Sequence, residues 1–395
     1  MNSKSILIIG AGKAQVPLII AANKEGYHTI VCDLNPGAPG VALADEFCKV
    51  STKDRYGLLE VAKSKEIDGI VANSEYAMCD VAFISSELGL VGNPEGAISI
   101  LSSKSKFREL QKRIGLYAPD TVDLDSSEQT NNVDMFVVKP DESSGSRGIS
   151  VFTDETKIGN ILRAAEEASR NGKAIIEEYI PLPSHSVIEG EIFLDHGEII
   201  WDGFFQTIRS KSAPMLPMTY VFPLRETEEK IDSVKEVLTR VFQSLGIIHG
   251  EYNVELFFTK DRKPFVIEIN PRQGGYELPR LVYEHSGIDY YRLLVTTSVG
   301  DDSYWDSLGD FKRQNRLLIH HMLFPRRNGY FKGIRISNEI SDKVYRCQID
   351  VRTGDEINTV DASSCIGFVD LDFDNVDDQL NTVFHMEELI KVEVV

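Results

Sequence analysis

The sequence predicts an α/β protein with several cores, and three patterns support this. Residues 5–103 alternate short apolar strands with helices, residues 250–270 read as a β-hairpin, and a glycine- and serine-rich loop joins two strands near residue 145. Strands that alternate with helices form parallel βαβ units in an open sheet. The chain has 395 residues, of which 42% are hydrophobic, and this length suggests two to four domains.

Residues 1–103 are predicted to form a Rossmann-like domain. Strands are expected at residues 6–9, 29–32 and 69–72, and helices at residues 15–25, 56–64 and 78–88.

The first turn of this domain reads GAGKAQ, with Gly10 and Gly12 after a strand and Asp33 at the end of the next strand. The pattern resembles the dinucleotide fingerprint, but Gln15 stands where the third glycine belongs. One interpretation is NAD binding with Asp33 on a ribose. We favour the other, in which the turn serves packing or a different substrate.

Composition argues against several classes of partner. The formal net charge is −19, whereas nucleic acid and anionic membranes require a basic surface. Five widely spaced cysteines form no CxxC pair, so neither a disulfide framework nor a zinc site is indicated. No apolar run reaches membrane-spanning length, and the N-terminus lacks the apolar segment of a signal peptide. We therefore expect a soluble cytoplasmic protein.

The glycine- and serine-rich loop is a candidate phosphate-binding segment. Residues 136–152 read FVVKPDESSGSRGISVF, in which a strand delivers Lys139 and Arg147 leads into the next strand. Such a loop lets several backbone N–H groups converge on anionic oxygens, while the lysine supplies a point charge. A flexible hairpin loop would have the same composition. The small residues of the loop are Ser143, Ser144, Gly145, Ser146 and Gly148.

The hairpin is predicted to set two glutamates opposite each other. With the turn centred at residues 261–262, antiparallel register pairs Glu255 with Glu268. Like charges at Cβ separations of roughly 4.5–5.5 Å are destabilising, so we expect a hard divalent cation, Mg²⁺ or Mn²⁺, beside them. A solvated polar face is the alternative. The same register sets Asn253 opposite Asn270 and Glu251 opposite Arg272, and the apolar face is expected to carry Tyr252, Val254, Leu256, Phe258, Phe265, Ile267 and Ile269.

Other elements can be placed along the chain. A basic helix begins at Lys104, a polar linker covers residues 120–132, and Asp154 is expected to cap the helix after the glycine loop. Residues 174–206 are strand-rich, and Thr227 is expected to cap a long helix with an apolar stripe.

The C-terminal part, residues 301–395, is predicted to be a small α+β domain of strands followed by a helix at residues 376–390. His320 and His321 are adjacent on a strand and face opposite sides of it, so we expect one in the core and one at the surface.

These segments together resemble an ATP-grasp enzyme of the biotin carboxylase and carbamoyl-phosphate synthase type over residues 5–299. In that family a helix carries a first basic residue on the nucleotide phosphates, and Lys104 corresponds to it. Lys139 resembles the second ATP lysine, and Arg147 closes the glycine loop as in the carboxylases. The resemblance implies ATP with Mg²⁺ or Mn²⁺ as cofactors. It also implies an ATP-grasp module over residues 104–300, with a small lobe at about 134–178 and a large lobe at about 179–300.

The resemblance includes the segment that holds the nucleoside. Adenine would be held by backbone groups, and ribose by a nearby side chain, for which His185 is our candidate and a solvated loop histidine the alternative. The Gly-x-Glu pattern of the synthases is absent here, because Leu182 and Ser184 occupy those positions. The hinge itself is Glu177, Glu178, Tyr179 and Ile180.

Further positions resemble the family's catalytic groups. Gln206, Arg209 and Lys211 are similar to the carboxylase Gln-x-x-His-x-Lys segment on the γ-phosphate and the activated carboxylate, with arginine in place of histidine; ordinary surface charge on a strand edge is the alternative. The family's metal ligands correspond to Glu255, Glu268 and Asn270, and its phosphate or substrate arginine corresponds to Arg272.

The residues after Arg272 indicate the reaction class. Biotin carboxylase has a basic glutamate there, whereas this chain has Gly274, Gly275 and Tyr276, which is similar to carboxylate–amine ligases and carbamoyl-phosphate synthases. The resemblance implies a ligase that forms an acylphosphate from a small carboxylate, such as an amino acid, and passes it to an amine. A bicarbonate-activating carboxylase or carbamoyl-phosphate synthase-like enzyme is one alternative, and a non-catalytic ATP-binding protein another. A homodimer is left open.

Overall fold

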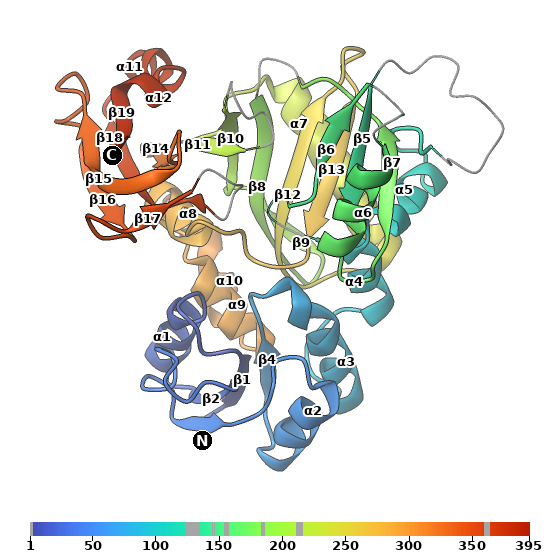
Figure 1. Cartoon of the computed structure of the whole chain (residues 1–395). Helices are drawn as coiled ribbons and strands as arrows, with labels where there is room; N and C mark the ends of the chain where they lie inside the picture. Colours follow the sequence, from blue (N-terminus) through green and yellow to red (C-terminus); the bar gives the residue numbers. More distant parts are fainter. Residues whose placement is uncertain are drawn as a thin grey trace.

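The computed structural model describes residues 3–122, 135–143, 145, 147–153, 158–182, 186–210, 216–358 and 364–395. Ser144, Ser146, Asp154, His185, Lys211 and most of the polar linker lie outside these ranges. Figure 1 shows an N-terminal domain below, a central part built around a large sheet, and a C-terminal unit at the upper left. Among the described helices, none has the length and apolar character needed to cross a bilayer.

The N-terminal domain is the predicted parallel sheet. Its described strands run in the order β3-β2-β1-β4 and all pair in parallel. The strands are β1 (Ser5–Ile9), β2 (His28–Cys32), β3 (Glu46–Cys48) and β4 (Gly69–Val71). The helices are α1 (Val16–Lys24), α2 (Arg55–Ser64), α3 (Met78–Leu88), α4 (Glu95–Ser102) and α5 (Lys104–Arg113), with a 3₁₀ turn, η1, at Glu75–Ala77.

The turn after β1 is packed by its own residues. The side chain of Gln15 covers the turn, since a Cβ added at Gly10 would lie 3.1 Å from Gln15 Cδ. Both carboxylate oxygens of Asp33 accept backbone N–H groups, from Ala11 and Asn35, at 2.9 Å each. The contacts therefore agree with the packing interpretation of this turn rather than with a ribose contact.

The central part has two sheets that face each other. A small antiparallel sheet in the order β6-β5-β7 carries α6. Its elements are β5 (Phe136–Pro140), β6 (Ser150–Phe152), α6 (Ile158–Ala168) and β7 (Ala174–Glu178).

The larger sheet, counted over the described residues, has nine strands in the order β13-β12-β8-β10-β11-β14-β18-β16, with β9 beside β8. Its strands before residue 300 are β8 (Ser186–Asp195), β9 (Glu198–Ile200), β10 (Phe204–Arg209), β11 (Pro217–Phe222), β12 (Gly250–Phe258) and β13 (Pro264–Asn270). The helices of this part are α7 (Glu228–Leu245), α8 (Leu278–Ser286), α9 (Tyr290–Ser298) and α10 (Ser303–Ser307), followed by the 3₁₀ turn η4 (Leu308–Asp310).

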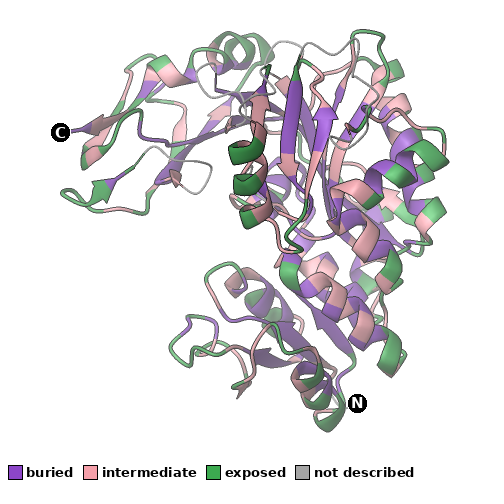
Figure 2. Cartoon of the chain, turned by 45° about the vertical axis from the view of Figure 1, so that its right-hand side comes forward, coloured by how far each residue is buried: buried purple, intermediate pink, exposed green. Residues whose placement is uncertain are grey.

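Helix α7 covers one face of this sheet and leaves the other to polar groups. Thr227 caps it as predicted, accepting the N–H of Lys230, and its stripe packs in one core with residues of β8, β12 and β13. Figure 2 shows the strands of this sheet as largely buried. Because side chains alternate along a strand, the opposite face receives the polar residues of β8, β12 and β13.

The C-terminal unit continues the large sheet and adds a second layer. Strands β14 (Leu317–Met322), β18 (Gly367–Phe373) and β16 (Val344–Ile349) extend the large sheet past the boundary expected at residue 301. Beside them lies a small sheet of β15 (Gly329–Ile336), β17 (Glu356–Ile357) and β19 (Ile390–Val394), with α11 (Val376–Val383) and α12 (Met386–Leu389).

Two expectations for the C-terminal part were wrong. The helix expected at residues 376–390 is broken into α11 and α12, and Ile390 already belongs to a strand that pairs with β15. His320 and His321 do alternate, but both are buried, with 0% and 2% exposure. The reason is that both faces of β14 are covered, because Leu318 and Met322 pack in one core with α8, and Ile319 packs in another with α11.

Candidate functional site

A cavity lies between the small sheet and the polar face of the large sheet. Apolar side chains line part of the wall, and charged groups converge on the rest. Of the predicted site residues, the lining includes Lys104, Lys139, Gly145, Arg147, Glu177, Glu178, Tyr179, Ile180, Arg209, Glu255 and Glu268.

Three carboxylates form a row across adjacent strands on the cavity side. Glu255 on β12 pairs with Glu268 on β13, as the sequence predicted, and with Glu189 on β8. Asn253 pairs with Asn270 in the next row, which confirms the predicted register. Sequence reasoning missed Glu189, because no local pattern shows that β8 lies beside β12.

Cations already partner two of these carboxylates. Arg209 forms an ion pair with Glu255, and Lys104 Nζ lies 3.6 Å from Glu268 Oε2. Asn270 Nδ2 donates to Glu268 Oε1 at 3.0 Å.

The three carboxyl groups differ in how readily they ionise. Burial opposes ionisation of Glu268, but Lys104 and the Asn270 hydrogen bond outweigh it and lower its pKa. Burial raises the pKa of Glu255, although Arg209 opposes the shift. Burial and the charge of Glu255 raise the pKa of Glu189 to about 8. The row therefore carries less negative charge at neutral pH than its three carboxyl groups would suggest.

The donor set suits a hard divalent cation. Carboxylate and amide oxygens from Glu255, Glu268 and Asn270 are the ligands that Mg²⁺ and Mn²⁺ take in proteins. Asn270, however, presents its amide nitrogen to Glu268. Metal binding requires the Asn270 amide to be turned so that its oxygen faces the cation.

A buried ion triad anchors the small sheet opposite this row. Lys139 Nζ lies 2.9 Å from Glu177 Oε2, and Arg108 Nε lies 2.6 Å from Glu177 Oε1. Glu177 is 0% exposed, and Lys139 and Arg108 lower its pKa to about 2 against the effect of burial. Arg108, on the basic helix α5, was not predicted as a site residue. The carboxylate of Glu177 thus orients Lys139 at the cavity wall.

The glycine loop follows Lys139 with the expected backbone. Gly145 and Gly148 have φ of +70° and +71°, a region that side chains disfavour. A Cβ at Gly148 would also lie 2.8 Å from Ala168 Cβ. Lys104 Nζ donates to the Ser143 carbonyl at 3.0 Å, which ties α5 to the start of the loop.

The hinge lies on the cavity wall, but part of its backbone is already engaged. The N–H groups of Glu178 and Tyr179 donate to the carbonyls of Asp120, at 2.9 Å, and Met135, at 3.0 Å. A backbone N–H contact to adenine would therefore fall to Ile180.

Three predicted positions are not among the described residues that line the cavity, namely Gln206, Asn270 and Arg272. Gln206 Nε2 donates to Ser186 Oγ at 2.6 Å. Arg272 lies beyond the end of β13, where its NH1 donates to the Gln273 carbonyl at 2.8 Å.

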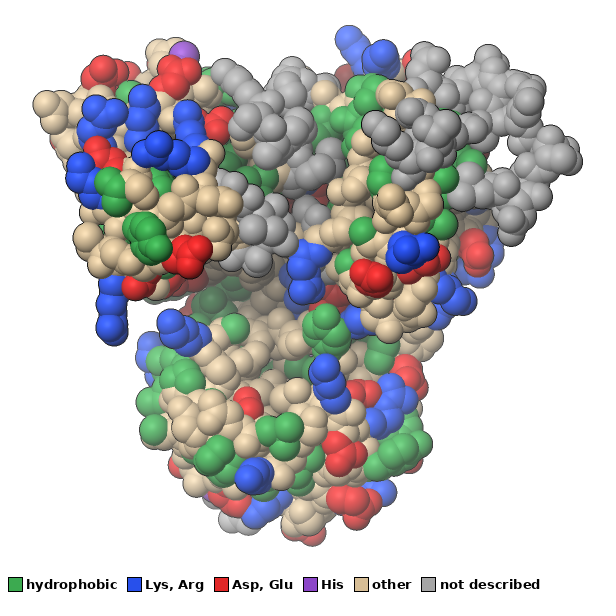
Figure 3. Space-filling model, viewed as in Figure 1, with side chains coloured by type: hydrophobic (Ala, Val, Ile, Leu, Met, Phe, Trp, Pro, Cys, Tyr) green, Lys and Arg blue, Asp and Glu red, His purple; other side chains and the backbone are tan. Residues whose placement is uncertain are grey.

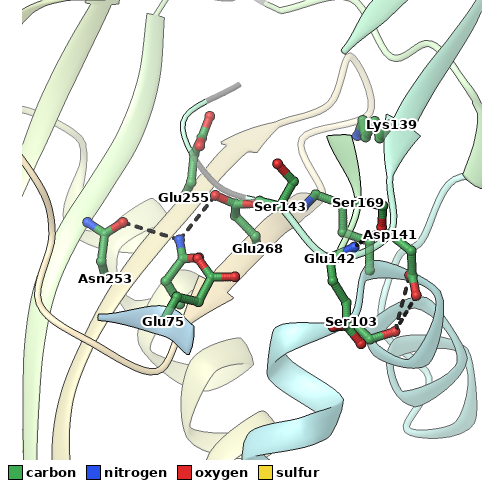
Figure 4. A network of polar contacts seen from close by, with 12 residues as sticks. Glu75, Ser103, Lys139, Asp141, Glu142, Ser143, Ser169, Asn253, Glu255 and Glu268 are labelled. Carbon is green, nitrogen blue, oxygen red and sulfur yellow. Dashed lines mark hydrogen bonds and ion pairs between the residues drawn. The ribbon is translucent and has the colours of Figure 1, made fainter. Parts of the chain in front are cut away.

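Arg272 meets a residue of the N-terminal domain that the sequence did not suggest. Its NH2 lies 3.6 Å from Glu75 Oε2, and Glu75 Oε1 lies 3.2 Å from NH2 of Arg170 in the small lobe. Glu75 is 8% exposed, and Figure 4 draws it in the same network of polar contacts as Glu268. Glu75 thereby connects three parts of the chain at the edge of the site.

Two details of the predicted hairpin were wrong. A bulge inserts Ile267, since Glu255 pairs with Glu268 but the next residue, Leu256, pairs with Val266. Phe265 and Ile267 therefore face the cavity together with Phe257, and Val266 packs in the core.

The second error concerns Arg272. Strand β13 ends at Asn270, so Arg272 does not pair with Glu251, which lies opposite Phe193 on β8.

The surface around these parts carries mixed charge. Figure 3 shows acidic and basic side chains interspersed over the N-terminal domain, and Lys and Arg side chains gathered on the C-terminal unit at the upper left.

Comparisons with known proteins identify a domain family and similar folds. The ATP-grasp domain family matches residues 133–279. The chain is 28% identical over 306 residues to the formate-dependent phosphoribosylglycinamide formyltransferase of Bacillus subtilis, covering 72% of this chain and 74% of that protein.

Among solved structures, L-amino acid ligase from Bacillus licheniformis has a TM-score of 0.80 at 19% identity and covers 100% of both chains. Biotin carboxylase from Campylobacter jejuni has a TM-score of 0.69 at 17% identity, covering 100% of this chain and 92% of that one. Residues 133–279 therefore form an ATP-grasp domain, and the chain has the fold of these solved proteins along its length.

Proposed function

We propose that the protein is an ATP-dependent carboxylate–amine ligase that works through an acylphosphate and acts on amino acids. The observation that carries this proposal is the arrangement around one cavity. Glu255 and Glu268 lie opposite each other on the large sheet, and Lys139 and the glycine loop line the same cavity from the small sheet. Metal-binding carboxylates opposed to phosphate-binding cations form a site for a nucleoside triphosphate.

The reaction proceeds in two displacements. A carboxylate oxygen of the first substrate attacks the γ-phosphorus of ATP, and the bond to the β-phosphate oxygen breaks to release ADP. The amine of the second substrate then attacks the acyl carbon, the C–O bond to phosphate breaks, and the amine loses one proton. Phosphorylation is needed because a free carboxylate is a poor electrophile.

The chain's own residues position groups and neutralise charge in this scheme. Lys104 and Lys139 would lie along the phosphates, and Arg209 near the transferred phosphoryl group. A divalent cation held by Glu255, Glu268 and Asn270 would neutralise charge that develops on the phosphoryl oxygens. Arg272 would bind the carboxylate-bearing substrate.

Four predicted residues in this scheme lie outside the described part of the chain. Lys211 remains our candidate for the γ-phosphate, His185 for ribose, and Ser144 and Ser146 for phosphate oxygens. Gln206 remains a candidate only if its contact with Ser186 opens when nucleotide binds.

The amino-acid substrate class rests on likeness rather than on a pocket. The structural neighbour from Bacillus licheniformis is an L-amino acid ligase, and its TM-score of 0.80 is higher than the 0.69 of the biotin carboxylase. The Gly274–Gly275 turn after Arg272, in place of a glutamate, also favours a ligase over a biotin-dependent carboxylase.

The experiment is a substrate screen with purified protein and MgATP. Amino acids are supplied singly and in pairs, phosphate release is measured, and products are identified by mass spectrometry. We expect phosphate release that depends on a particular pair and a product lighter than the two substrates by one water. Stimulation by bicarbonate alone would support the carboxylase alternative. ATP binding without turnover under every condition would support the non-catalytic alternative.

A further inference from the structure

The loop at residues 272–275 rests on buried polar side chains from β8 and β12. Gly274 donates its backbone N–H to Glu191 Oε2 at 2.9 Å, and Gln273 Nε2 donates to Glu251 Oε2 at 2.7 Å. Asn253 Nδ2 donates to Glu191 Oε1 at 2.6 Å. None of these side chains is more than 9% exposed. The loop-supporting cluster is Glu191, Glu251, Asn253 and Gln273.

The register of the sheet explains why these residues meet. Glu191 on β8 lies opposite Asn253 on β12, and Asn253 lies opposite Asn270 on β13. Glu251 precedes Asn253 by two residues and therefore shares its face of the sheet. Asn270 Nδ2 also lies 3.4 Å from Asn253 Oδ1 (Figure 4). The cluster is thus continuous with the row that faces the ATP cavity.

The hydrogen bonds of the cluster leave one acceptor without a donor among the described residues. Both oxygens of Glu191 accept hydrogen bonds, from Asn253 and Gly274, and Glu251 Oε2 accepts one from Gln273. Glu251 Oε1 is enclosed, and no donor among the described residues reaches it. The two carboxyl groups lie within hydrogen-bonding reach of each other.

A single proton held between the Glu191 and Glu251 carboxyl groups would supply the missing donor. Two ionised carboxylates in contact and out of water would repel each other strongly. A proton on Glu251 Oε1 becomes the missing donor and points to Glu191, which keeps the charge and its two other hydrogen bonds. Burial, and then the charge of Glu191, raise the pKa of Glu251 well above its ordinary value, in agreement with this assignment.

We propose that Glu191 and Glu251 share one proton and that this pair positions the loop carrying Arg272, with Glu251 neutral and Glu191 ionised. The inference rests on the proposed function, because Arg272 matters there as the substrate arginine. Neither glutamate is among the described residues that line the ATP cavity, so both are positioning residues. The loop packs closely against Glu191 at Gly274, where an added Cβ would lie 2.3 Å from Glu191 Oε1.

Two conservative substitutions separate this assignment from a general structural role. Glu251→Gln copies a neutral Glu251, since its amide oxygen can accept from Gln273 while its NH₂ group donates to Glu191. Glu191→Gln cannot copy an ionised Glu191, because its NH₂ group must face either the Asn253 amide or the Gly274 N–H, which are both donors. Glu198→Gln, on an exposed glutamate of β9, is the matched control.

The primary measurement is hydrogen–deuterium exchange of the full-length protein over residues 271–276, with MgATP affinity measured by calorimetry. For Glu191→Gln we expect loop exchange to rise about tenfold or more, because a hydrogen bond to a charged group is replaced by opposed donors. For Glu251→Gln and Glu198→Gln we expect exchange within about twofold of wild type. The affinity for MgATP should stay unchanged in all three.

The second measurement tests the link to substrate. The apparent KM for an equimolar pool of the twenty standard amino acids, read by phosphate release, should rise in Glu191→Gln and stay near wild type in Glu251→Gln. If the pool gives no turnover with wild-type protein, the proposed function fails while the exchange experiment still tests the shared proton. Equal damage by both substitutions, or an unchanged loop in Glu191→Gln, would overturn the inference.

Discussion

Arg209 and Glu255 form an ion pair on the wall of the ATP cavity, so a carboxylate expected to bind metal already has a cationic partner. The sequence suggested that the opposed pair Glu255 and Glu268 needs a metal ion for neutralisation. The structure shows a second solution, because Lys104 lies beside Glu268 in the same way. A bound metal ion would then replace Arg209 and Lys104 as the partner of these carboxylates. It would not enter a site whose negative charge is uncompensated.

This exchange predicts a metal-dependent stability for Arg209→Gln. The side chains of Arg209 and Glu255 are only 7% and 17% exposed, and removal of one partner from a buried pair costs about 3–5 kcal/mol. We expect the free energy of unfolding to fall by about that amount in chelator, and the loss to shrink in Mg²⁺, which can partner Glu255 instead. Thermal melts with and without Mg²⁺ measure this.

The control for this prediction is Arg163→Gln, which changes an exposed arginine on α6. Its melting temperature should match that of wild type in both buffers. A loss in Arg209→Gln that is the same with and without Mg²⁺ would show that the cation does not replace the guanidinium.

Substitution of Glu268, the proposed metal ligand, should remove turnover without removing the fold. Glu268→Gln keeps the shape of the side chain but weakens a ligand that Lys104, Asn270 and Arg272 hold in its ionised form. We expect kcat for ATP hydrolysis or ligation to fall by about two to three orders of magnitude. Phosphate release and circular dichroism are the measurements, with Glu198→Gln as the control. Full ADP release by Glu268→Gln in the presence of substrates would contradict the role given to this residue.

The sequence was sufficient for the parts of the site that depend on local pattern. Alternation and one turn fixed the register that sets Glu255 opposite Glu268. The helical stripe after Thr227 and its cap were likewise predicted from local spacing and confirmed. These features follow from residues within a few positions of one another, and local patterns report such neighbours directly.

The parts that failed depend on strand neighbours that are distant in the sequence. Glu189 joins the carboxylate row only because β8 pairs with β12, and Glu75 reaches Arg272 only because the N-terminal domain packs against the site. The bulge at Ile267, which turns Phe265 toward the cavity, has no sequence marker such as glycine.

The contact between the N-terminal domain and the small lobe predicts a lower affinity for MgATP in Arg170→Ala. Arg170 NH2 lies 3.2 Å from Glu75 Oε1, and its guanidinium carbon lies 4.9 Å from the centre of the Tyr76 ring. The small lobe carries Lys139 and the glycine loop. Without the Arg170 contact, the small lobe spends less time in the position that binds MgATP. An ion pair and a cation–π contact of about 1 kcal/mol each predict a Kd for MgATP up to roughly thirtyfold higher.

Calorimetry with MgATP measures this effect, and Arg163→Ala on the neighbouring helix serves as the control. The melting temperature of the N-terminal domain should change little, because Arg170 lies outside its core. An unchanged Kd in Arg170→Ala would mean that the small lobe keeps its position without this contact.

The Glu177 triad predicts a specific loss of stability in acid. Lys139 and Arg108 hold the pKa of Glu177 near 2, against an ordinary value of 4.5. Because the folded pKa is lower than the unfolded one, the stabilisation is fully present above about pH 4.5 and is lost as the pH falls toward 2. A depression of this size corresponds to about 3 kcal/mol.

Glu177→Gln tests the triad, because it removes the charge and leaves Lys139 and Arg108 without their shared carboxylate. At pH 7 we expect the free energy of unfolding to fall by about 3–5 kcal/mol. Between pH 4.5 and pH 2 the difference between wild type and variant should shrink, since the wild-type carboxylate becomes protonated in that window. Urea unfolding at pH 7, 4.5 and 3 measures both effects. A difference that stays constant across these pH values would show that Glu177 stabilises the fold through packing and not through its charge.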